Sequence, residues 1–325
     1  MNPIKVGIIG TGRHGSRYAS HIAHDISGLE LAATCRRSPE GQKQAEKWDV
    51  CCHGDWRNLI ANPAVDAVIS VTPPYINLAI ARECVKEKKP LLIEKPLAMN
   101  QAESSLIVEM FRSAQIPLTV GHLLRFNSTI RALRKELSRV GTVFLFSAHH
   151  RLEKLQQDWF DNPELSGGGV MLHNAVHLFD TLRFITGREV VRVRSSMFRR
   201  YTSRVEDLFT AQVEMEGALV GTVDSGNISE SRSGRYEFIG SEGQLQGDQV
   251  QGFIEFVRGT KREPLPMDAP GPTLIPLLQA WRDYLKGNGP NPVTGEDGLA
   301  AIRICDACRQ SAIEDRWVEV HERVE

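Results

Sequence analysis

The sequence predicts a doubly wound α/β domain with a parallel sheet, followed by an α+β domain with a large, mostly antiparallel, open-faced sheet. In the first 120 residues, short apolar segments alternate with segments of helical period, and a G-x-G-x-x-G string follows the first apolar segment. After about residue 122, strand-like segments follow one another mostly without helices between them. Alternation favours parallel βαβ units, whereas consecutive strands favour antiparallel pairing. We therefore expect domains at 1–121 and 122–325.

The elements of the first domain follow from apolar runs and helix signals. Strands are expected at 5–10, 30–35, 67–71, 91–94 and 118–120, and helices at 16–24, 39–47, 78–86 and 102–113. Ser38 is a good N-cap residue and Pro39 suits a first helical position, so we expect them to begin the second helix. Strands separated by helices of this length predict a sheet covered on both faces.

The second domain is expected to be dominated by strands. These are predicted at 140–151, 190–200, 205–215, 218–225, 235–240 and 250–257. A helix is predicted at 169–185, beginning at the last of three consecutive glycines, and two more are predicted near the end of the chain, at 274–286 and 298–313. Such a succession of strands predicts an antiparallel sheet.

Composition excludes several classes of partner. The chain has 325 residues, of which 41% are hydrophobic and 24% charged, and its net charge is −1. This charge gives no basic surface for nucleic acid or an anionic membrane. Neither a signal peptide nor an apolar run long enough to span a bilayer is evident, so we expect a cytoplasmic protein.

The cysteines are expected to be reduced thiols, since their spacing is not that of a disulfide framework. Cys305 and Cys308 have the spacing of a redox motif but lie in a helical pattern, which favours a structural role. The Cys51-Cys52-His53 run lacks a second ligand pair, so we expect no metal there. The six cysteines are Cys35, Cys51, Cys52, Cys84, Cys305 and Cys308.

The glycine string predicts a dinucleotide site of the Rossmann kind. Its first glycine permits a tight turn, its second lets backbone approach a pyrophosphate, and its third allows close packing of helix on strand. The alternative is a tight βα turn that binds nothing. The cofactor-binding residues predicted in this loop are Gly10, Thr11, Gly12, Arg13, His14 and Gly15.

The end of the second strand indicates which dinucleotide binds. NAD sites usually place a carboxylate there, but Glu30 opens the strand and lies at the wrong end. The strand instead ends in Arg36, Arg37 and Ser38. Two guanidinium groups and a hydroxyl suit a 2′-phosphate, so NADP(H) is expected to be preferred, with NAD(H) possible. The alternative is a pair of surface arginines at the sheet edge.

Further motifs resemble those of the glucose-fructose oxidoreductase / inositol dehydrogenase family, often called Gfo/Idh/MocA, over nearly the whole chain. The resemblance implies hydride transfer between NAD(P) and a secondary alcohol or carbonyl of a sugar, a cyclitol or a related small molecule. It also implies a homodimer or homotetramer paired through the C-terminal sheet. The motifs are Thr72-Pro73, Glu94-Lys95-Pro96, Gly121-His-Leu-Leu-Arg125-Phe126, and Gly167-Gly-Gly169 with His177 and Asp180.

In this family the lysine of Glu-Lys-Pro reaches the cofactor and the reacting carbon, which implies that Lys95 is catalytic. A lysine beside an oxidised nicotinamide has a lowered pKa and can transfer the hydroxyl proton. Thr72, Pro73 and Glu94 would lie on the cofactor side. The alternative is that Lys95 is a surface lysine before a turn.

The resemblance makes His177 the acid/base group, whereas His173 stands where the family usually has aspartate. Residues four apart share a helix face, so we expect both imidazoles near the substrate. A zinc pair is the alternative, but no glutamate lies between them and no metal is expected. Asn174 is the further substrate residue predicted on this helix. By position, Arg125, Trp159 and His149 are also predicted to line the pocket, and the alternative for Trp159 is a place in the core.

Two other functions stay open at this point. One is a glycosidase or lyase that holds NAD for a transient redox step. The other is a non-catalytic NADP-binding regulator, for which the change at His173 is the argument. Such a regulator would need neither Lys95 nor His177, so the presence of both favours an enzyme.

Overall fold

The computed structural model describes residues 2–154 and 159–320, which form two compact units. One unit contains the residues up to Leu123 together with Pro272–Leu299, and the other contains Leu124–Gly271 together with the residues from Ala300 onward. The segment Pro272–Leu299 thus lies with the first unit, which differs from the two continuous domains expected at 1–121 and 122–325. Among the described helices, none has the length and apolar character needed to cross a membrane.

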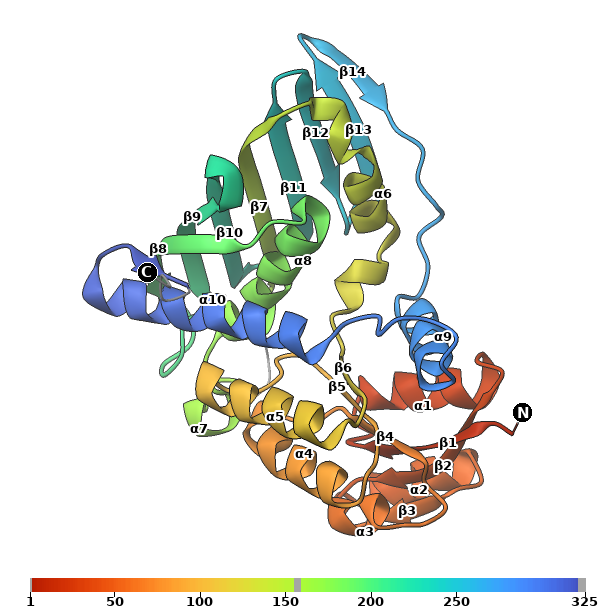
Figure 1. The fold of residues 1–325 in the computed structure, drawn as a ribbon. Helices are drawn as coiled ribbons and strands as arrows, with labels where there is room; N and C mark the ends of the chain where they lie inside the picture. The colour runs from red at the N-terminus through yellow and green to blue at the C-terminus, as the bar shows by residue number, and fades with distance from the viewer. Residues whose placement is uncertain (1, 155–158, 321–325) are drawn as a thin grey trace. The chain divides into compact units, whose positions relative to one another are not determined.

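The first unit is built on a six-stranded parallel sheet in the order β3-β2-β1-β4-β5-β6 (Figure 1). This is the strand order of a doubly wound dinucleotide-binding fold, so the expected α/β class is confirmed. Val6 and Ile8 are fully buried in the central strand. The strands are β1 (Ile4–Ile9), β2 (Leu29–Cys35), β3 (Cys51–His53), β4 (Ala67–Ser70), β5 (Leu91–Ile93) and β6 (Leu118–Val120).

Helices alternate with these strands along the chain and cover the sheet. Five of them follow in chain order: α1 (Gly15–His24), α2 (Glu40–Lys47), α3 (Trp56–Ile60), α4 (Asn77–Lys86) and α5 (Gln101–Ala114). The short β3 and α3 were not predicted, because three to five residues are too few to show a period. The expected cap of α2 was wrong: the helix begins at Glu40 after Pro39, and the Ser38 hydroxyl makes no capping bond.

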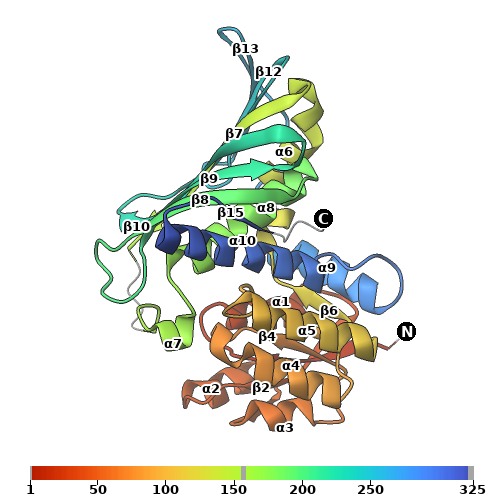
Figure 2. The same cartoon turned by 60° about the vertical axis from the view of Figure 1, so that its left-hand side comes forward.

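The segment that rejoins the first unit is anchored by polar contacts. Helix α9 (Leu274–Leu285) packs on α1, and Arg282 donates a hydrogen bond of 2.8 Å to the carbonyl of Ser27. The Thr119 hydroxyl of β6 donates to Asn291 over 2.9 Å. Helix α10 (Gly295–Glu314) begins in this unit and continues into the other (Figure 2). These contacts are far apart in sequence, so no local pattern predicts them.

The second unit is built on a nine-stranded sheet in the order β14-β13-β12-β11-β7-β10-β9-β8-β15. Its neighbours pair antiparallel except β7 and β10, which are parallel, so the expected mostly antiparallel sheet is confirmed. The strands are β7 (Val143–Glu153), β8 (Val190–Phe198), β9 (Leu208–Met215), β10 (Leu219–Ser229), β11 (Ser233–Gly240), β12 (Gly243–Asp248), β13 (Phe253–Arg258), β14 (Lys261–Pro264) and β15 (Val318–Glu319).

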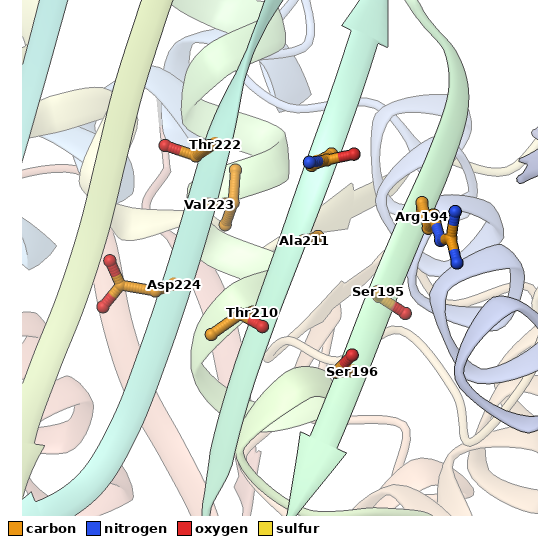
Figure 3. A pocket seen from close by; sticks show the side chains of 9 residues that line it. Arg194, Ser195, Ser196, Thr210, Ala211, Thr222, Val223 and Asp224 are labelled. Carbon is orange, nitrogen blue, oxygen red and sulfur yellow. The ribbon is translucent and has the colours of Figure 1, made fainter. Parts of the chain in front are cut away.

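One face of this sheet carries helices and the other is open (Figure 2). Helix α6 (Ser128–Glu136) contacts β12 and β13, and α8 (Val176–Thr186) contacts β7. Along β9, Phe209 and Val213 are buried whereas Thr210 and Gln212 are exposed. A shallow pocket on the open face is lined by residues of β8, β9 and β10, including Thr210, Thr222 and Asp224 (Figure 3).

The helix predicted at 169–185 is interrupted near its start. Residues Met171–Ala175 form a single π-turn, and α8 begins only at Val176. A π-turn inserts a residue into the helix and changes the direction of the side chains before it, which is frequent at functional sites. Helices α6 and α7 (Pro163–Ser166) and strands β12, β14 and β15 were not predicted, because most of these segments are short.

Candidate active-site residues

The glycine loop after β1 has no room for a side chain at its first and last glycines, but it has open space at the middle one. Gly10 has a φ of +90°, and a Cβ there would lie 2.2 Å from the carbonyl oxygen of Val71. A Cβ at Gly15 would lie 2.0 Å from the carbonyl oxygen of Gly10. A Cβ at Gly12 would meet nothing within 4 Å. The outer glycines therefore keep the turn tight, and the open space at Gly12 fits a dinucleotide pyrophosphate at the start of α1.

The two arginines at the end of β2 have different surroundings. Arg36 donates to the carbonyl of Thr11 over 3.0 Å and to Gln44 over 3.1 Å, so its guanidinium supports the glycine loop. Arg37 is exposed and makes no hydrogen bond or ion pair among the described residues. Glu30 pairs in register with Lys5 at the other end of the strand. Of the two guanidinium groups at this strand end, that of Arg37 is therefore the more exposed.

Glu94, which follows β5, is a buried carboxylate held by three donors. His14 lies 2.8 Å and the Tyr18 hydroxyl 2.6 Å from Oε1, and the amide of Lys95 donates to Oε2 over 3.1 Å. Burial opposes ionisation, but the bonds to His14 and Tyr18 hold the pKa of Glu94 below its ordinary value. Burial and the Glu94 charge raise the pKa of Tyr18. These hydrogen bonds thus fix Glu94, the residue that precedes Lys95.

Lys95 lies between Glu94 and a cis peptide bond to Pro96. Its side chain is half-buried. Burial lowers the pKa of the Lys95 ammonium, although the negative charge of Glu94 opposes that shift. A lysine with a lowered pKa loses its proton more readily, which is the property that a general base needs.

Thr72 and Pro73 lie in the loop after β4, in a hydrogen-bonded group with Asn77. The hydroxyl groups of Ser70 and Thr72 are 2.9 Å apart, and Thr72 lies 3.1 Å from the side-chain oxygen of Asn77. The amide nitrogen of Asn77 donates to the carbonyls of Pro96 and Leu97 over 3.1 and 3.2 Å. The loop after β4 is therefore joined to the turn that follows Lys95.

In the second unit, the half-buried carboxylate of Glu206 shapes the turn that follows the glycine triplet. Glu206 accepts hydrogen bonds of 3.0 Å from the amides of Gly169 and Met171, and its own carbonyl accepts from Val170 over 2.9 Å. A Cβ at Gly169 would lie 1.9 Å from that carbonyl. Burial raises the pKa of Glu206. The glycine is thus needed for close approach of two backbone segments.

His173 lies in the π-turn and is buried among aromatic rings. Its Nε2 is 2.8 Å from the carbonyl oxygen of Ser166, and since a carbonyl only accepts, this nitrogen carries a hydrogen. The ring centroids of Trp159 and Phe160 lie 5.6 and 5.0 Å from that of His173. Trp159 and His173, which were both predicted to line the substrate pocket, are thus neighbours.

His177 lies in α8 beside a histidine that the sequence did not single out. The ring centroids of His177 and His150 are 6.3 Å apart, with the rings at 73° to each other. His149, the residue named from the sequence, is opposite Arg235 and Asp224 in the register of the sheet. Burial and then Arg151 lower the pKa of His149. Successive strand residues point to opposite faces, so only one of the two histidines can face α8.

The other predicted pocket residues have defined partners. The side-chain nitrogen of Asn174 donates to Asn227 over 2.6 Å, and both residues are buried. Arg125 forms a two-pronged ion pair with Asp180, with bonds of 3.0 and 2.6 Å, and 10% and 1% of the two side chains are exposed. Arg125 therefore has a structural partner within its own unit. No cluster of metal-ligating side chains exists among the described residues.

Two family models match the chain. The model described as "Oxidoreductase family, NAD-binding Rossmann fold" matches residues 4–122. The model described as "Oxidoreductase family, C-terminal alpha/beta domain" matches residues 135–320. Together they account for both sheets.

Named relatives and a solved structure are similar over most of the chain. A myo-inositol 2-dehydrogenase of Thermotoga maritima is 28% identical and covers 98% of this chain and 99% of its own. A 1,5-anhydro-D-fructose reductase of Ensifer adhaerens is 29% identical over 75% of this chain and 76% of its own. The structure of a levoglucosan dehydrogenase with NADH and levoglucosan has a TM-score of 0.89 at 19% identity, covering 99% and 100% of the two chains.

Proposed function

Because the chain belongs to the Gfo/Idh/MocA family of NAD-binding oxidoreductases, we propose that it is an NADP(H)-dependent dehydrogenase or reductase of a sugar or cyclitol. The reaction would interconvert a secondary alcohol and its carbonyl. The similarity to an inositol dehydrogenase and an anhydrofructose reductase supports this substrate class. The observation that carries the preference for NADP(H) is the exposed Arg37 at the end of β2, where the strand is followed by two arginines and a serine, and the nearby Glu40 pairs with Arg36 over 3.7 Å.

The glycine loop would hold the pyrophosphate, and the bound dinucleotide would supply or accept the hydride. Arg37 would bind the 2′-phosphate. Arg36 would act indirectly, because its guanidinium already donates to Thr11 and Gln44. Thr72 and Pro73 would line the nicotinamide side of the site, and Glu94 would hold the backbone of Lys95.

Lys95 and His177 are the groups to which we assign proton transfer. The lowered pKa of Lys95 increases the neutral fraction that can accept the hydroxyl proton during alcohol oxidation. His177 would serve as the second acid/base group, with His150 beside it. His173 and Asn174 would contact the substrate, with Trp159 beside His173 as part of the same wall.

Calorimetric binding of NADPH and NADH to the wild type and to Arg37→Ser tests the cofactor preference. A charge-assisted bond contributes about 1.5–3 kcal/mol, so Arg37→Ser should weaken NADPH binding about 10- to 150-fold and leave NADH nearly unchanged. Arg82→Ser is the matched control, because Arg82 is an exposed arginine on α4. Tighter binding of NADH than NADPH by the wild type would contradict the assignment.

We further propose that the open sheet face pairs with a second copy of the chain to form a homodimer or homotetramer. Leu145 of β7 and Val220 of β10 are neighbours in register, and each is 45% exposed. Ile239 of β11 is opposite Leu145 on its other side. An apolar row of this kind across an exposed sheet is typical of an interface.

A further inference from the structure

Asn77 is a buried asparagine whose side chain is fully used. It is the first residue of α4, and 1% of it is exposed. Its side chain contacts Thr72 through the oxygen and the carbonyls of Pro96 and Leu97 through the nitrogen. It thereby joins the loop after β4 to the turn after β5.

The direction of these hydrogen bonds follows from the donors available. The carbonyls of Pro96 and Leu97 can only accept, so the amide nitrogen of Asn77 must face them. The oxygen of Asn77 then faces Thr72, and the single hydroxyl hydrogen of Thr72 must point to it. Ser70 must therefore donate to Thr72. The result is one directed chain of bonds from the end of β4 to the turn after Lys95.

Lys95 lies between two anchors. On its amino side, the carboxylate of Glu94 is held by His14 and Tyr18. On its carboxyl side, the carbonyls of Pro96 and Leu97 are held by the two N–H groups of Asn77. Leu97 and Ala98 are buried, so the turn is fixed to the body of the unit beyond this point.

We propose that Asn77 is a positioning residue for Lys95, acting through the carbonyls of Pro96 and Leu97. This inference rests on the proposed role of Lys95 in proton transfer. Displacing a catalytic group by about 1 Å can cost about 100-fold in rate. Loss of the Asn77 donors should therefore lower the catalytic step while leaving ground-state binding largely intact.

The test compares Asn77→Ala and Asn77→Asp with the wild type. The aspartate keeps an acceptor for Thr72 but has no donor for the two carbonyls when ionised. We expect both variants to lose about 10- to 100-fold in kcat. The KM for the alcohol and the Kd for NADPH should change less than about threefold, because binding is shared among many contacts. Amide hydrogen exchange in residues 95–98 should be faster than in the wild type without cofactor or substrate.

Asn291→Ala is the matched control. Asn291 accepts from the Thr119 hydroxyl over 2.9 Å and donates to the carbonyl of Leu118 over 2.7 Å, which is the same kind of arrangement in the same unit. This variant should leave kcat and the exchange of residues 95–98 at wild-type values. Asn291 is half-buried, and a purely structural effect of losing an asparagine that joins two backbone segments would appear in both variants.

The outcomes separate the inference from the function on which it rests. If Lys95→Met retains wild-type turnover, the proposed role of Lys95 is wrong. If Lys95→Met is inactive while Asn77→Asp keeps wild-type kcat and wild-type exchange at 95–98, the positioning role of Asn77 is overturned. Should Asn77→Ala fail to fold, Asn77→Asp and the exchange measurement give the same decision.

Discussion

Asp180→Asn is the substitution whose effect can be worked out most directly from the structure. Asp180 is 1% exposed and forms a two-pronged ion pair with Arg125, whose side chain is 10% exposed. The asparagine keeps the shape but removes the charge that compensates a buried guanidinium. Breaking a buried pair in this way costs about 3–5 kcal/mol, and we expect about 3 kcal/mol because the amide oxygen can still accept.

The assay is urea unfolding followed by circular dichroism, with Asp315→Asn as the control. Asp315 pairs with Arg194 across 3.0 Å, but 89% and 47% of these side chains are exposed. Such a surface pair contributes about 0–1 kcal/mol. The double variant Arg125→Met/Asp180→Leu should recover much of the lost stability, since no buried charge is left.

A loss below about 1 kcal/mol in Asp180→Asn would refute this reasoning. A loss that small is what an exposed pair such as the control gives, and it would mean that the Arg125–Asp180 pair contributes no more than a surface pair. It would also mean that the Arg125 guanidinium does not depend on Asp180. Arg125 would then be available for the substrate contact that its position in the sequence suggested. The measurement thus decides between a structural and a binding role for this arginine.

Two further predictions concern the lysine and the open sheet. Removing the Glu94 charge in Glu94→Gln takes away the influence that raises the pKa of Lys95, so this pKa falls further. The rising limb of the pH profile of kcat for alcohol oxidation should move to lower pH; a move to higher pH would contradict the role of Lys95 as base. In Val220→Glu, pairing of two copies through the sheet would bury the new carboxylate, so sedimentation should shift toward the monomer. The control Arg258→Glu, at an exposed strand end, should leave sedimentation unchanged. Unchanged sedimentation of Val220→Glu would argue against pairing through this face.

Much of the first unit follows from local sequence signals. A glycine string after an apolar strand requires a tight turn, and the structure shows why: Gly10 and Gly15 each leave no room for a Cβ. The position of Glu30 at the beginning of β2 was also apparent, because strand residues keep their order along the sheet. These features depend on neighbours in the chain.

The features that sequence reasoning missed depend on partners far along the chain. His150 is notable only because α8 covers one face of β7, and the alternation of His149 and His150 does not tell which face that is. Asn77 carries no motif signal of its own in the sequence, and its contacts are seen only where it meets Pro96 and Leu97. The π-turn at Met171–Ala175 has no periodic signal, since it is a single inserted residue in a helix.

The most direct measurement of the central claim is a panel of inositols, sugars and 2-hydroxy acids incubated with NADP⁺ or NAD⁺, followed by absorbance of the reduced nicotinamide. The account predicts steady formation of NADPH with at least one sugar or cyclitol, at a higher kcat/KM than with NAD⁺. Conversion of a glycoside with no net reduction of either cofactor would contradict it, since that is the behaviour of a hydrolase or lyase with a transient redox step.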